Sequence, residues 1–301
     1  MMKNYDYIIA DRRVRLSGAV AEMVERALGS FKPFVTACEA DTEPLLEIKS
    51  SEKLDFDKEA YSLLTQFDLE DGLGQCCFYG ADFGYALVIE GGEERFLMLC
   101  DKGVKEAEIL VESEPAAKYI SYLRFGLWFA INMAFVQDGC SAVHSSTIVW
   151  DGEAVMFLGE SGTGKSTHTR LWLDNISGAE LLNDDSPFVA CDDEGAKVYG
   201  SPWSGKTPCY KNECYPLRAM VRLSQAPHNA IKELRGVRAI GALLPSLPPA
   251  FVFDKTLENA LLGVLSKVLD KVKVYHLECL PDIAAAELSF ITVFDDEVTG
   301  R

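Results

Sequence analysis

The sequence predicts an α/β fold in which a mixed-sheet domain follows a small α+β domain. Three observations predict it. In the second half of the chain, short apolar segments alternate with helix-like segments. Within that half, a glycine-rich loop joins an apolar strand-like segment to a helix-like one. In the first half, β-like runs accompany a single amphipathic helix pattern.

Length and composition are those of an ordinary globular protein. The 301 residues allow one or two domains, and 48% hydrophobic with 25% charged residues argues against disorder, collagen and coiled coil. A formal charge of -17 repels phosphate backbones, so we expect no nucleic-acid partner. The cysteines are odd in number and include no CxxC pair, which favours reduced thiols and a cytoplasmic protein.

Two segments bear on targeting and membranes. Residues 1–16 carry both signs of charge and no apolar core, so no signal peptide is expected. The most apolar segment, 125–136, is much shorter than the roughly 20 residues that a membrane span needs. We therefore expect a buried helix there and no membrane partner.

The first predicted domain covers residues 1–112 and has an α+β pattern. We expect one or two strands at 7–16, a helix at 19–28 and two strands within 75–99. Residues 39–71 hold eleven acidic residues against three lysines, which we interpret as a solvated surface. No chemical motif is visible in this part of the sequence.

The second predicted domain covers residues 113–301 and opens with a helix. Ser113 and Pro115 are typical of a helix start, and the apolar pattern continues to Phe135, which predicts a core helix. Asp151 and the following glycine predict a hairpin turn. The other expected strands lie at 142–150, 154–158, 180–182, 186–191, 197–199, 218–223, 230–234 and 274–277, and the helices at 164–175, 256–272 and from 281.

The sharpest motif is GESGTGKS, residues 159–166, which fits the P-loop pattern. Its glycines let the backbone N–H groups point into one concavity, which binds phosphate together with the following helix N-terminus. Lys165 is expected to reach the β- and γ-phosphates, and Ser166 to supply a hydroxyl to Mg²⁺. The alternative is an ordinary glycine-rich turn. The predicted nucleotide-binding residues are Gly159, Glu160, Ser161, Gly162, Thr163, Gly164, Lys165, Ser166 and Thr167.

An aspartate pair, Asp184 and Asp185, follows the predicted P-loop by one helix and one strand. In a right-handed crossover the second strand would lie beside the first, and both C-terminal ends would meet at one edge. One carboxylate could then hold the metal while the other accepts the proton of an attacking hydroxyl. Asp192 and Asp193 form a similar pair, which we interpret as a turn.

Two further candidate site regions are suggested by their positions in the sequence. His144 lies on the strand that precedes the P-loop strand and could contact Asp184 or the γ-phosphate, although a structural histidine is equally compatible with the sequence. Residues 201–240 form a locally basic segment that contains a long loop. In that loop Lys206 could clamp the transferring phosphoryl group, and Trp203 could stack on a base; a plain surface loop is the alternative.

The segments VHSS at 143–146, GESGTGKS at 159–166 and NDD at 183–185 resemble the catalytic domain of HPr kinase/phosphorylase. The P-loop and aspartate strand also look like phosphoenolpyruvate carboxykinase, and later segments resemble a less characterised branch of HPr-kinase-related proteins. The resemblance covers residues 142–288 and implies the HPr kinase/carboxykinase type of P-loop kinase fold. It also implies that Asp184 is the catalytic base, Asp185 a metal-linked acid and His144 a supporting group.

The sequence thus predicts an ATP- and Mg²⁺-dependent kinase that transfers the γ-phosphoryl group to a hydroxyl, foremost a protein or peptide serine. The glycine-rich LEIRGLGIIN-type segment of HPr kinase/phosphorylase is absent, and only LRGVRAIG at 234–241 is similar in part. HPr as the acceptor and a reverse phosphorylase activity are therefore not implied. A small-molecule kinase, a carboxykinase-like enzyme and a non-catalytic nucleotide-binding regulator stay open, as does a homo-oligomer.

Overall fold

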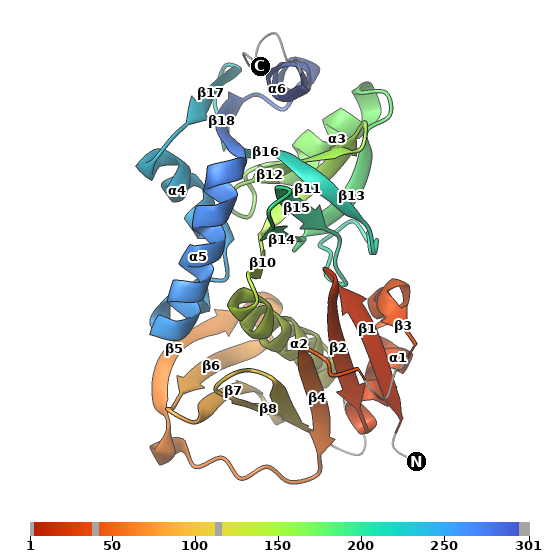
Figure 1. Cartoon of the computed structure of the whole chain (residues 1–301), viewed down its shortest axis with the longest axis vertical. Helices are drawn as coiled ribbons and strands as arrows, with labels where there is room; N and C mark the ends of the chain where they lie inside the picture. Colours follow the sequence, from red (N-terminus) through yellow and green to blue (C-terminus); the bar gives the residue numbers. More distant parts are fainter. Residues whose placement is uncertain (1–2, 38–41, 112–115, 295–301) are drawn as a thin grey trace. The chain divides into compact units, whose positions relative to one another are not determined.

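A computed structural model describes residues 3–37, 42–111 and 116–294, which form a mixed α/β fold (Figure 1). The chain makes two compact units: residues 1–138 with 250–260, and residues 139–249 with 261–301. The sequence predicts a domain boundary between residues 112 and 113. The two compact units divide elsewhere, because the long helix that follows that point packs with the first unit.

Over its described residues, the first unit contains a sheet of nine strands in the order β3-β1-β2-β4-β9-β8-β7-β6-β5 (Figure 1). Neighbouring strands are antiparallel except at the two pairings of β4, with β2 and with β9, which are parallel. The strands are β1 (Asn4–Ile9), β2 (Arg12–Ser17), β3 (Val35–Thr36), β4 (Leu46–Ser51), β5 (Ser62–Leu69), β6 (Gly74–Gly80), β7 (Gly84–Gly91), β8 (Glu94–Asp101) and β9 (Glu106–Leu110).

In the described part of the first unit, helices α1 and α2 accompany this sheet. Helix α1 (Ala19–Ala27) lies where the sequence predicts it. Helix α2 (Ala117–Gln137) packs against β8 and is the expected core helix; the predicted start at Ser113 and Pro115 lies outside the described residues. By length and composition α2 could cross a membrane, but 72% of its most apolar window is buried, as in the core helix of a folded domain.

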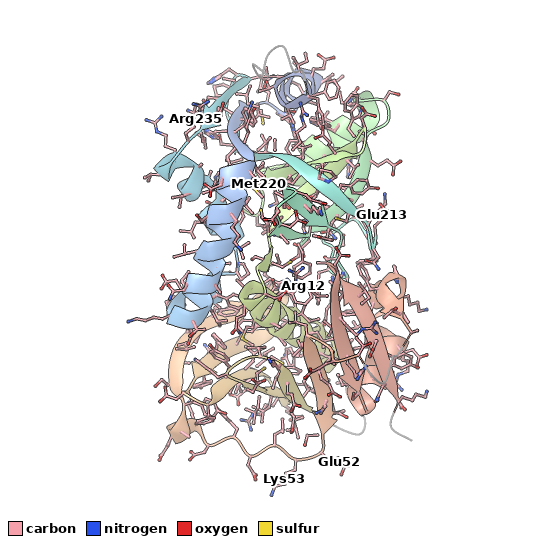
Figure 2. All side chains as sticks on the ribbon, viewed as in Figure 1. Arg12, Glu52, Lys53, Glu213, Met220 and Arg235 are labelled. Carbon is pink, nitrogen blue, oxygen red and sulfur yellow. The ribbon has the colours of Figure 1, made fainter. Side chains whose placement is uncertain are left out.

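The solvated surface predicted at 39–71 is present only in part, because Leu46 and Ile48 of β4 are buried. Residues 52–60 are largely exposed, including Glu52 and Lys53 at the rim of the unit (Figure 2). Eight of the nine cysteines lie in the described residues, and all eight are free thiols, as predicted.

The second unit contains a mixed sheet in the order β10-β14-β15-β16-β12-β11-β13, with β18 paired to β16 and β17 paired to β18 (Figure 1). The long strand β16 runs parallel to both β12 and β18, whereas the other neighbours are antiparallel. The strands are β10 (Cys140–Ala142), β11 (Ser145–Trp150), β12 (Glu153–Leu158), β13 (Glu180–Asp185), β14 (Phe188–Cys191), β15 (Ala196–Tyr199), β16 (Cys214–Gln225), β17 (Ala230–Leu234) and β18 (Lys273–Cys279).

Strands β11 and β12 form the predicted hairpin. Asp151 and Gly152 make its turn with φ angles of 49° and 78°, as a two-residue turn with left-handed central residues requires. The single strand predicted at 142–150 is wrong in one respect. It is broken at Val143 and His144, because β10 pairs with β14 while β11 pairs with β12 and β13.

The α-helices in the described residues of this unit are α3 (Lys165–Asn175), α4 (Val237–Leu243), α5 (Lys255–Lys271, from Leu261 onward) and α6 (Ile283–Phe294). Helix α4 is not predicted by the sequence analysis. Helix α3 packs on β11, β12 and β13 and contacts α6 (Figure 1). Met220, near the middle of β16, is buried within this sheet (Figure 2).

A buried polar cluster joins α3 to α6. Ser289 Oγ donates to the carbonyl of Ala286 (2.9 Å) and accepts from Trp172 Nε1 (2.9 Å). His168 Nε2 lies 3.0 Å from the same hydroxyl, and because the hydroxyl proton is already donated, Nε2–H is the donor in that contact. The ring also packs edge-on against Phe157. Burial lowers the pKa of His168 to about 4, so the imidazole is neutral near pH 7.

His168 should make the second unit less stable in mild acid. Between pH 6.5 and 4 the unfolded chain binds a proton that the folded chain excludes, so stability falls as pH falls. From pH 7 to pH 5 this amounts to about 2 kcal/mol in the free energy of unfolding. Urea unfolding should show a flatter pH dependence for His168→Gln than for wild type. The exposed His228→Gln is the control, and equal slopes for wild type and His168→Gln would contradict the assignment.

Candidate active site

The predicted site residues come together at one edge of the second sheet. In the register of the sheet, Ser145 of β11 lies opposite Leu158 of β12 on one side and opposite Asp185 of β13 on the other. The start of β11 and the ends of β12 and β13 are therefore aligned. His144, the glycine-rich loop (residues 159–164) and the aspartate pair all lie at this edge.

One expectation about this edge is wrong. The aspartate strand does not lie beside the P-loop strand, because β11 is inserted between β12 and β13. Both outer strands are antiparallel to β11, so they run parallel to each other and still end at the same edge. The insertion places His144 between the glycine-rich loop and the aspartates, which adjacent strands would not have done.

The glycine-rich loop closes on itself and leads into α3. Gly164, the N-cap of that helix, has a φ of +106°, which a residue with a side chain rarely adopts. Thr163 donates twice to the carbonyl of Glu160, from its backbone nitrogen (3.1 Å) and from its hydroxyl (2.6 Å). These contacts stabilise the turn between β12 and α3, which has the strand–loop–helix order that the P-loop prediction requires.

Lys165 folds back over this loop. Its Nζ donates to the carbonyl of Gly159 (2.8 Å) and lies 2.9 Å from His144 Nε2. Burial lowers the pKa of Lys165, while the charges of Asp185 and Asp184 oppose that change. The ammonium therefore lies within the loop and experiences the charges of both aspartates.

His144 connects Lys165 to the aspartate pair. Because a charged Lys165 can only donate, His144 Nε2 accepts, and the ring proton is then carried on Nδ1. Nδ1 lies 3.3 Å from Asp185 Oδ1. The backbone nitrogen of His144 donates to the carbonyl of Ser246 (2.7 Å), which fixes the break between β10 and β11. His144 thus contacts Asp185, whereas the sequence analysis offered Asp184 as its partner.

The two aspartates face opposite sides of the sheet. Asp184 lies opposite Ser146, whose hydroxyl donates to Thr169 of α3 (3.2 Å), so both face that helix. Ser166 Oγ lies 3.3 Å from Asp184 Oδ1, and Asp184 is only 7% exposed. The next side chain along the strand points to the other face, and Asp185 keeps 37% of its side chain exposed.

Asn183 is a supporting residue that the sequence analysis missed. Fully buried, it accepts with Oδ1 from the backbone nitrogens of Asp185 (3.2 Å) and Ser186 (2.9 Å). Its Nδ2 donates to the carbonyl of Trp203 (2.9 Å). One amide therefore joins the end of β13 to the loop of residues 201–213. Asn183 belongs to the NDD motif, but the motif does not predict its role because the loop that it binds, at Trp203, is distant in the sequence.

The loop of residues 201–213 lies against the aspartate pair. Gly205 N donates to the carbonyl of Asp184 (2.8 Å), and a side chain at Gly205 would lie 2.7 Å from that oxygen. Lys206 follows directly and is exposed. Trp203 does not face a ligand site as proposed: it is 4% exposed and packs against Phe188.

Arg222 is a second residue that the sequence did not single out. It lies opposite Leu158 in the parallel pairing of β16 with β12. Its guanidinium contacts the Glu160 carboxylate (3.3 Å) and the carbonyl of Ala242 (3.3 Å). Its charge also acts to lower the pKa of Lys165. The register of β16, which begins some fifty residues after the glycine-rich loop, brings the charge of Arg222 to the site. No local sequence motif predicts this position.

The donor set fits Mg²⁺ held together with nucleotide phosphates. Among the described residues, no group of three or more His, Cys, Asp or Glu could hold a metal alone. Mg²⁺ usually binds nucleotide-site proteins through one or two carboxylates, phosphates and water. The adjacent Ser166 hydroxyl and Asp184 carboxylate match that requirement.

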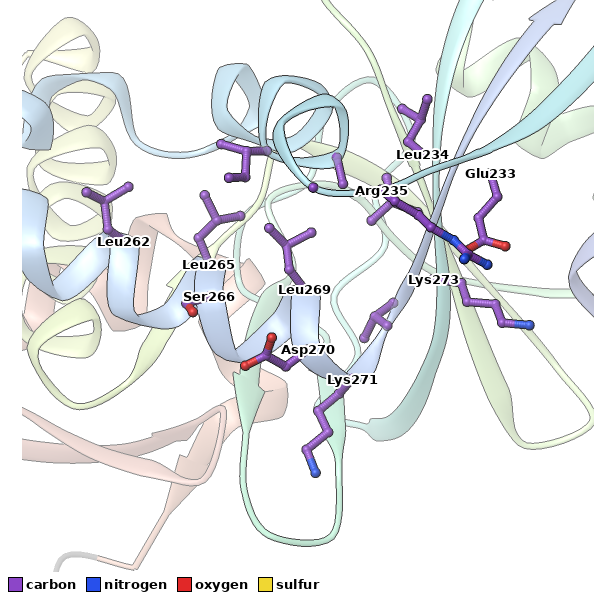
Figure 3. Close-up of a pocket in the computed structure, with 15 residues that line it drawn as sticks. Glu233, Leu234, Arg235, Leu262, Leu265, Ser266, Leu269, Asp270, Lys271 and Lys273 are labelled. Atoms are coloured by element: carbon purple, nitrogen blue, oxygen red, sulfur yellow. The ribbon is translucent and has the colours of Figure 1, made fainter.

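Among the cavities bounded by described residues of the second unit, two bear on the site. The first, about 550 Å³, is bounded by Gly162, Gly164 and Thr167 and thus borders the glycine-rich loop. The second, about 520 Å³, lies among β17, α4, α5 and β18, with Leu265 and Leu269 among its lining residues (Figure 3). None of the predicted site residues lines the second cavity, so it is separate from the candidate active site.

Comparison with known proteins finds likeness to solved structures. No protein-family model matches the sequence, and no curated protein does. Among solved structures, the Hpr(Ser) kinase/phosphatase from Coxiella burnetii is similar at 12% identity and a TM-score of 0.33. The match covers 53% of this chain and 92% of that chain. A likeness at this TM-score and identity carries no conclusion about fold family, activity or substrate.

Proposed function

We propose that this chain is an ATP- and Mg²⁺-dependent kinase that transfers the γ-phosphoryl group to a hydroxyl. The observation that carries the proposal is the row of contacts at one sheet edge. Lys165 lies 2.9 Å from His144, His144 lies 3.3 Å from Asp185, and Ser166 lies 3.3 Å from Asp184. A phosphate-binding loop, a metal-binding pair and a base are the parts that phosphoryl transfer requires.

The contacts favour roles for the aspartates that are opposite to those implied by the family resemblance. Asp184, buried beside Ser166, is suited to hold Mg²⁺. Asp185 is the more exposed carboxylate, and His144 orients it, so it is suited to accept the proton of an incoming hydroxyl. Lys165 would neutralise charge on the β- and γ-phosphates, with Arg222 nearby as a further cation.

The acceptor is proposed to be a serine of a protein or peptide. Asp185 is partly exposed, and residues 205–208 of the neighbouring loop are exposed, so the hydroxyl could approach from solvent on a large molecule. A small hydroxyl compound would use the same base. We place the activity in the cytoplasm, in keeping with the free thiols.

The test is incubation of the pure protein with γ-labelled ATP and Mg²⁺, alone and with cell extract. We expect label on a hydroxyl acceptor in the extract as an acid-stable phosphoester. Release of label only as inorganic phosphate would contradict the proposal, and so would an equal yield from Lys165→Ala. A labelled carboxylic acid product would point to carboxykinase-like chemistry.

Lys206→Ala should lower turnover more than nucleotide affinity. The backbone hydrogen bond from Gly205 to Asp184 holds the loop against the aspartates, and Lys206 is the next residue of that loop. A cation at this place would act on the charge that develops during transfer. We expect kcat to fall about tenfold or more while the Kd for ATP changes little. Lys211→Ala in the same loop, where Lys211 pairs with Glu180, is the control. A normal kcat for Lys206→Ala would make this lysine an ordinary surface residue.

A further inference from the structure

The cavity among β17, α4, α5 and β18 has the size of a small-molecule site. Its volume is about 520 Å³, within the roughly 300–1,000 Å³ that is common for such sites. Every residue that lines it belongs to the second unit. The proposed phosphoryl transfer uses none of these residues, so a ligand bound here would be distinct from both the phosphoryl donor and the acceptor.

The walls of this cavity are aliphatic along most of their length. On α5, Leu262, Leu265 and Leu269 lie on successive turns and share one face of the helix. Ile240 of α4 and Val274 of β18 also line the cavity. Among the described lining residues there is no aromatic ring on which a base could stack. The three leucines extend along about 10 Å of helix, so the cavity suits an extended alkyl chain.

One end of the cavity is charged. Arg235, Glu233 and Lys273 lie together at that end (Figure 3). Arg235 Nε donates to the Glu233 carboxylate (2.6 Å), and this bond, with the charges of Arg235 and Lys273, lowers the pKa of Glu233. The other charged lining residues, Asp270 and Lys271, have opposite signs. Two cations thus act on one carboxylate, which leaves a local positive charge in a chain whose net charge is -17.

We propose that this cavity binds an aliphatic carboxylate and that the bound ligand activates phosphoryl transfer. The carboxylate head would lie beside Arg235 and Lys273. The alkyl tail would run along Leu269, Leu265 and Leu262, which lie progressively farther from the charged end (Figure 3). Burial of the tail favours binding, and the local positive charge selects an anionic head. The activation rests on the proposed function, whereas the binding does not.

Helix α4 connects this cavity to the glycine-rich loop. Ala239 and Ile240 of α4 line the cavity. Near the end of the same helix, the carbonyl of Ala242 accepts from Arg222 (3.3 Å). The other terminal nitrogen of Arg222 contacts the carboxylate of Glu160 in the loop (3.3 Å). A ligand that contacts α4 is therefore linked to the phosphate-binding loop through one side chain.

The turn that follows α4 makes a second connection. The carbonyl of Ser246 accepts from the backbone nitrogen of His144 (2.7 Å). The ring of His144 contacts both Lys165 and Asp185, as described above. The position of residues 237–246 thus bears on the loop and on the proposed base together.

Helix α4 is held in place by few buried side chains. Three of its seven residues are buried, and Val237 is 84% exposed. Such a segment opens locally at a small cost in free energy. A ligand packed against Ala239 and Ile240 contacts α4 only in the closed position, so binding favours that position. The bonds to Arg222 and His144 are then formed in a larger fraction of molecules, and we expect transfer to become faster.

The binding test compares three compounds by calorimetry, each below its micelle concentration: decanoate, butyrate and decyltrimethylammonium. Wild type should bind decanoate. Butyrate lacks most of the tail and decyltrimethylammonium carries the opposite charge, so each should bind at least about tenfold more weakly. Absence of decanoate binding would overturn the proposal. Equal binding of decanoate and decyltrimethylammonium would also overturn it, because the charged end would then select nothing.

Variants locate the ligand. Arg235→Gln should weaken decanoate about tenfold, because it removes a charge-assisted hydrogen bond to the head. Arg238→Gln, at an exposed position of α4 that does not line the cavity, is its control and should bind like wild type. Leu262→Ser should weaken binding about fivefold through the tail, with the similarly exposed Ile283→Ser as control. Wild-type affinity in both Arg235→Gln and Leu262→Ser would place decanoate elsewhere and overturn the assignment.

The activation is tested by single-turnover label transfer with and without saturating decanoate. Wild type should transfer about fivefold faster or more when decanoate is bound, and Arg235→Gln should need about tenfold more decanoate for the same gain. Decanoate that binds in the cavity without changing the transfer rate would overturn the activation. Absence of transfer under both conditions would contradict the proposed function, whereas weakened binding in Arg235→Gln and Leu262→Ser alone would still support the cavity assignment.

Discussion

Lys165→Ala should abolish most of the stabilisation that ATP gives to this protein. A ligand at about a hundred times its Kd stabilises the folded state by about 2.7 kcal/mol, which raises Tm by several degrees. Lys165 Nζ lies within the glycine-rich loop, 2.8 Å from the Gly159 carbonyl, where it would meet the β- and γ-phosphates. Without that charge, MgATP should shift Tm little in a thermal melt.

The comparison is made between shifts rather than absolute melting temperatures. Removing a partly buried ammonium changes the contacts of His144 and can alter the Tm of the free protein. Lys267→Ala, at an exposed position of α5, is the matched control and should keep the full shift. Equal shifts in wild type and Lys165→Ala would mean that ATP does not bind through this loop.

The second large effect is expected at Asp185. Asp185→Asn keeps the shape of the side chain and removes its basicity, so phosphoryl transfer should fall about a hundredfold or more. Loss of a negative charge near the triphosphate should leave ATP affinity equal or slightly higher. His144→Ala should cause a smaller loss of transfer, because His144 orients Asp185 through the 3.3 Å contact. Single-turnover rates and calorimetric affinities measure the two effects separately.

Asp184→Asn is the control that distinguishes the two carboxylates. Its contact with Ser166 assigns it to the metal. This variant should therefore need a higher Mg²⁺ concentration than wild type to reach its maximal rate of transfer. If Asp184→Asn instead lost transfer at unchanged Mg²⁺ requirement, while Asp185→Asn transferred normally, the assignment implied by the family resemblance would hold. The two aspartates would then exchange the roles proposed here.

Local patterns predicted the elements of the site. The hairpin turn at Asp151 and Gly152, the loop before α3 and the arrival of Asp184 at the same edge all depend on residues close together in the chain. Turn chemistry, glycine spacing and the direction of a crossover are local properties, so one sequence is enough to predict them.

What the sequence could not predict depends on pairing between distant segments. The crossover rule gives the direction of β13 but not its neighbour, so the insertion of β11 was missed. Arg222 reaches the loop only through the register of β16 with β12. Trp203 stands in a loop rich in glycine and proline, yet it is buried because Asn183 draws that loop against β13. Each of these outcomes follows from tertiary contacts that leave no local pattern.

The central claim is that a hydroxyl acceptor receives the γ-phosphoryl group at the edge that holds Asp185. The most direct measurement is label transfer from γ-labelled ATP in one cell extract, with wild type, Lys165→Ala and Asp185→Asn side by side. We expect a phosphoester-labelled acceptor with wild type, a loss of about a hundredfold or more with Asp185→Asn, and no labelling with Lys165→Ala. Equal labelling by wild type and Asp185→Asn, or ATP binding by wild type with no labelled acceptor, would contradict the claim.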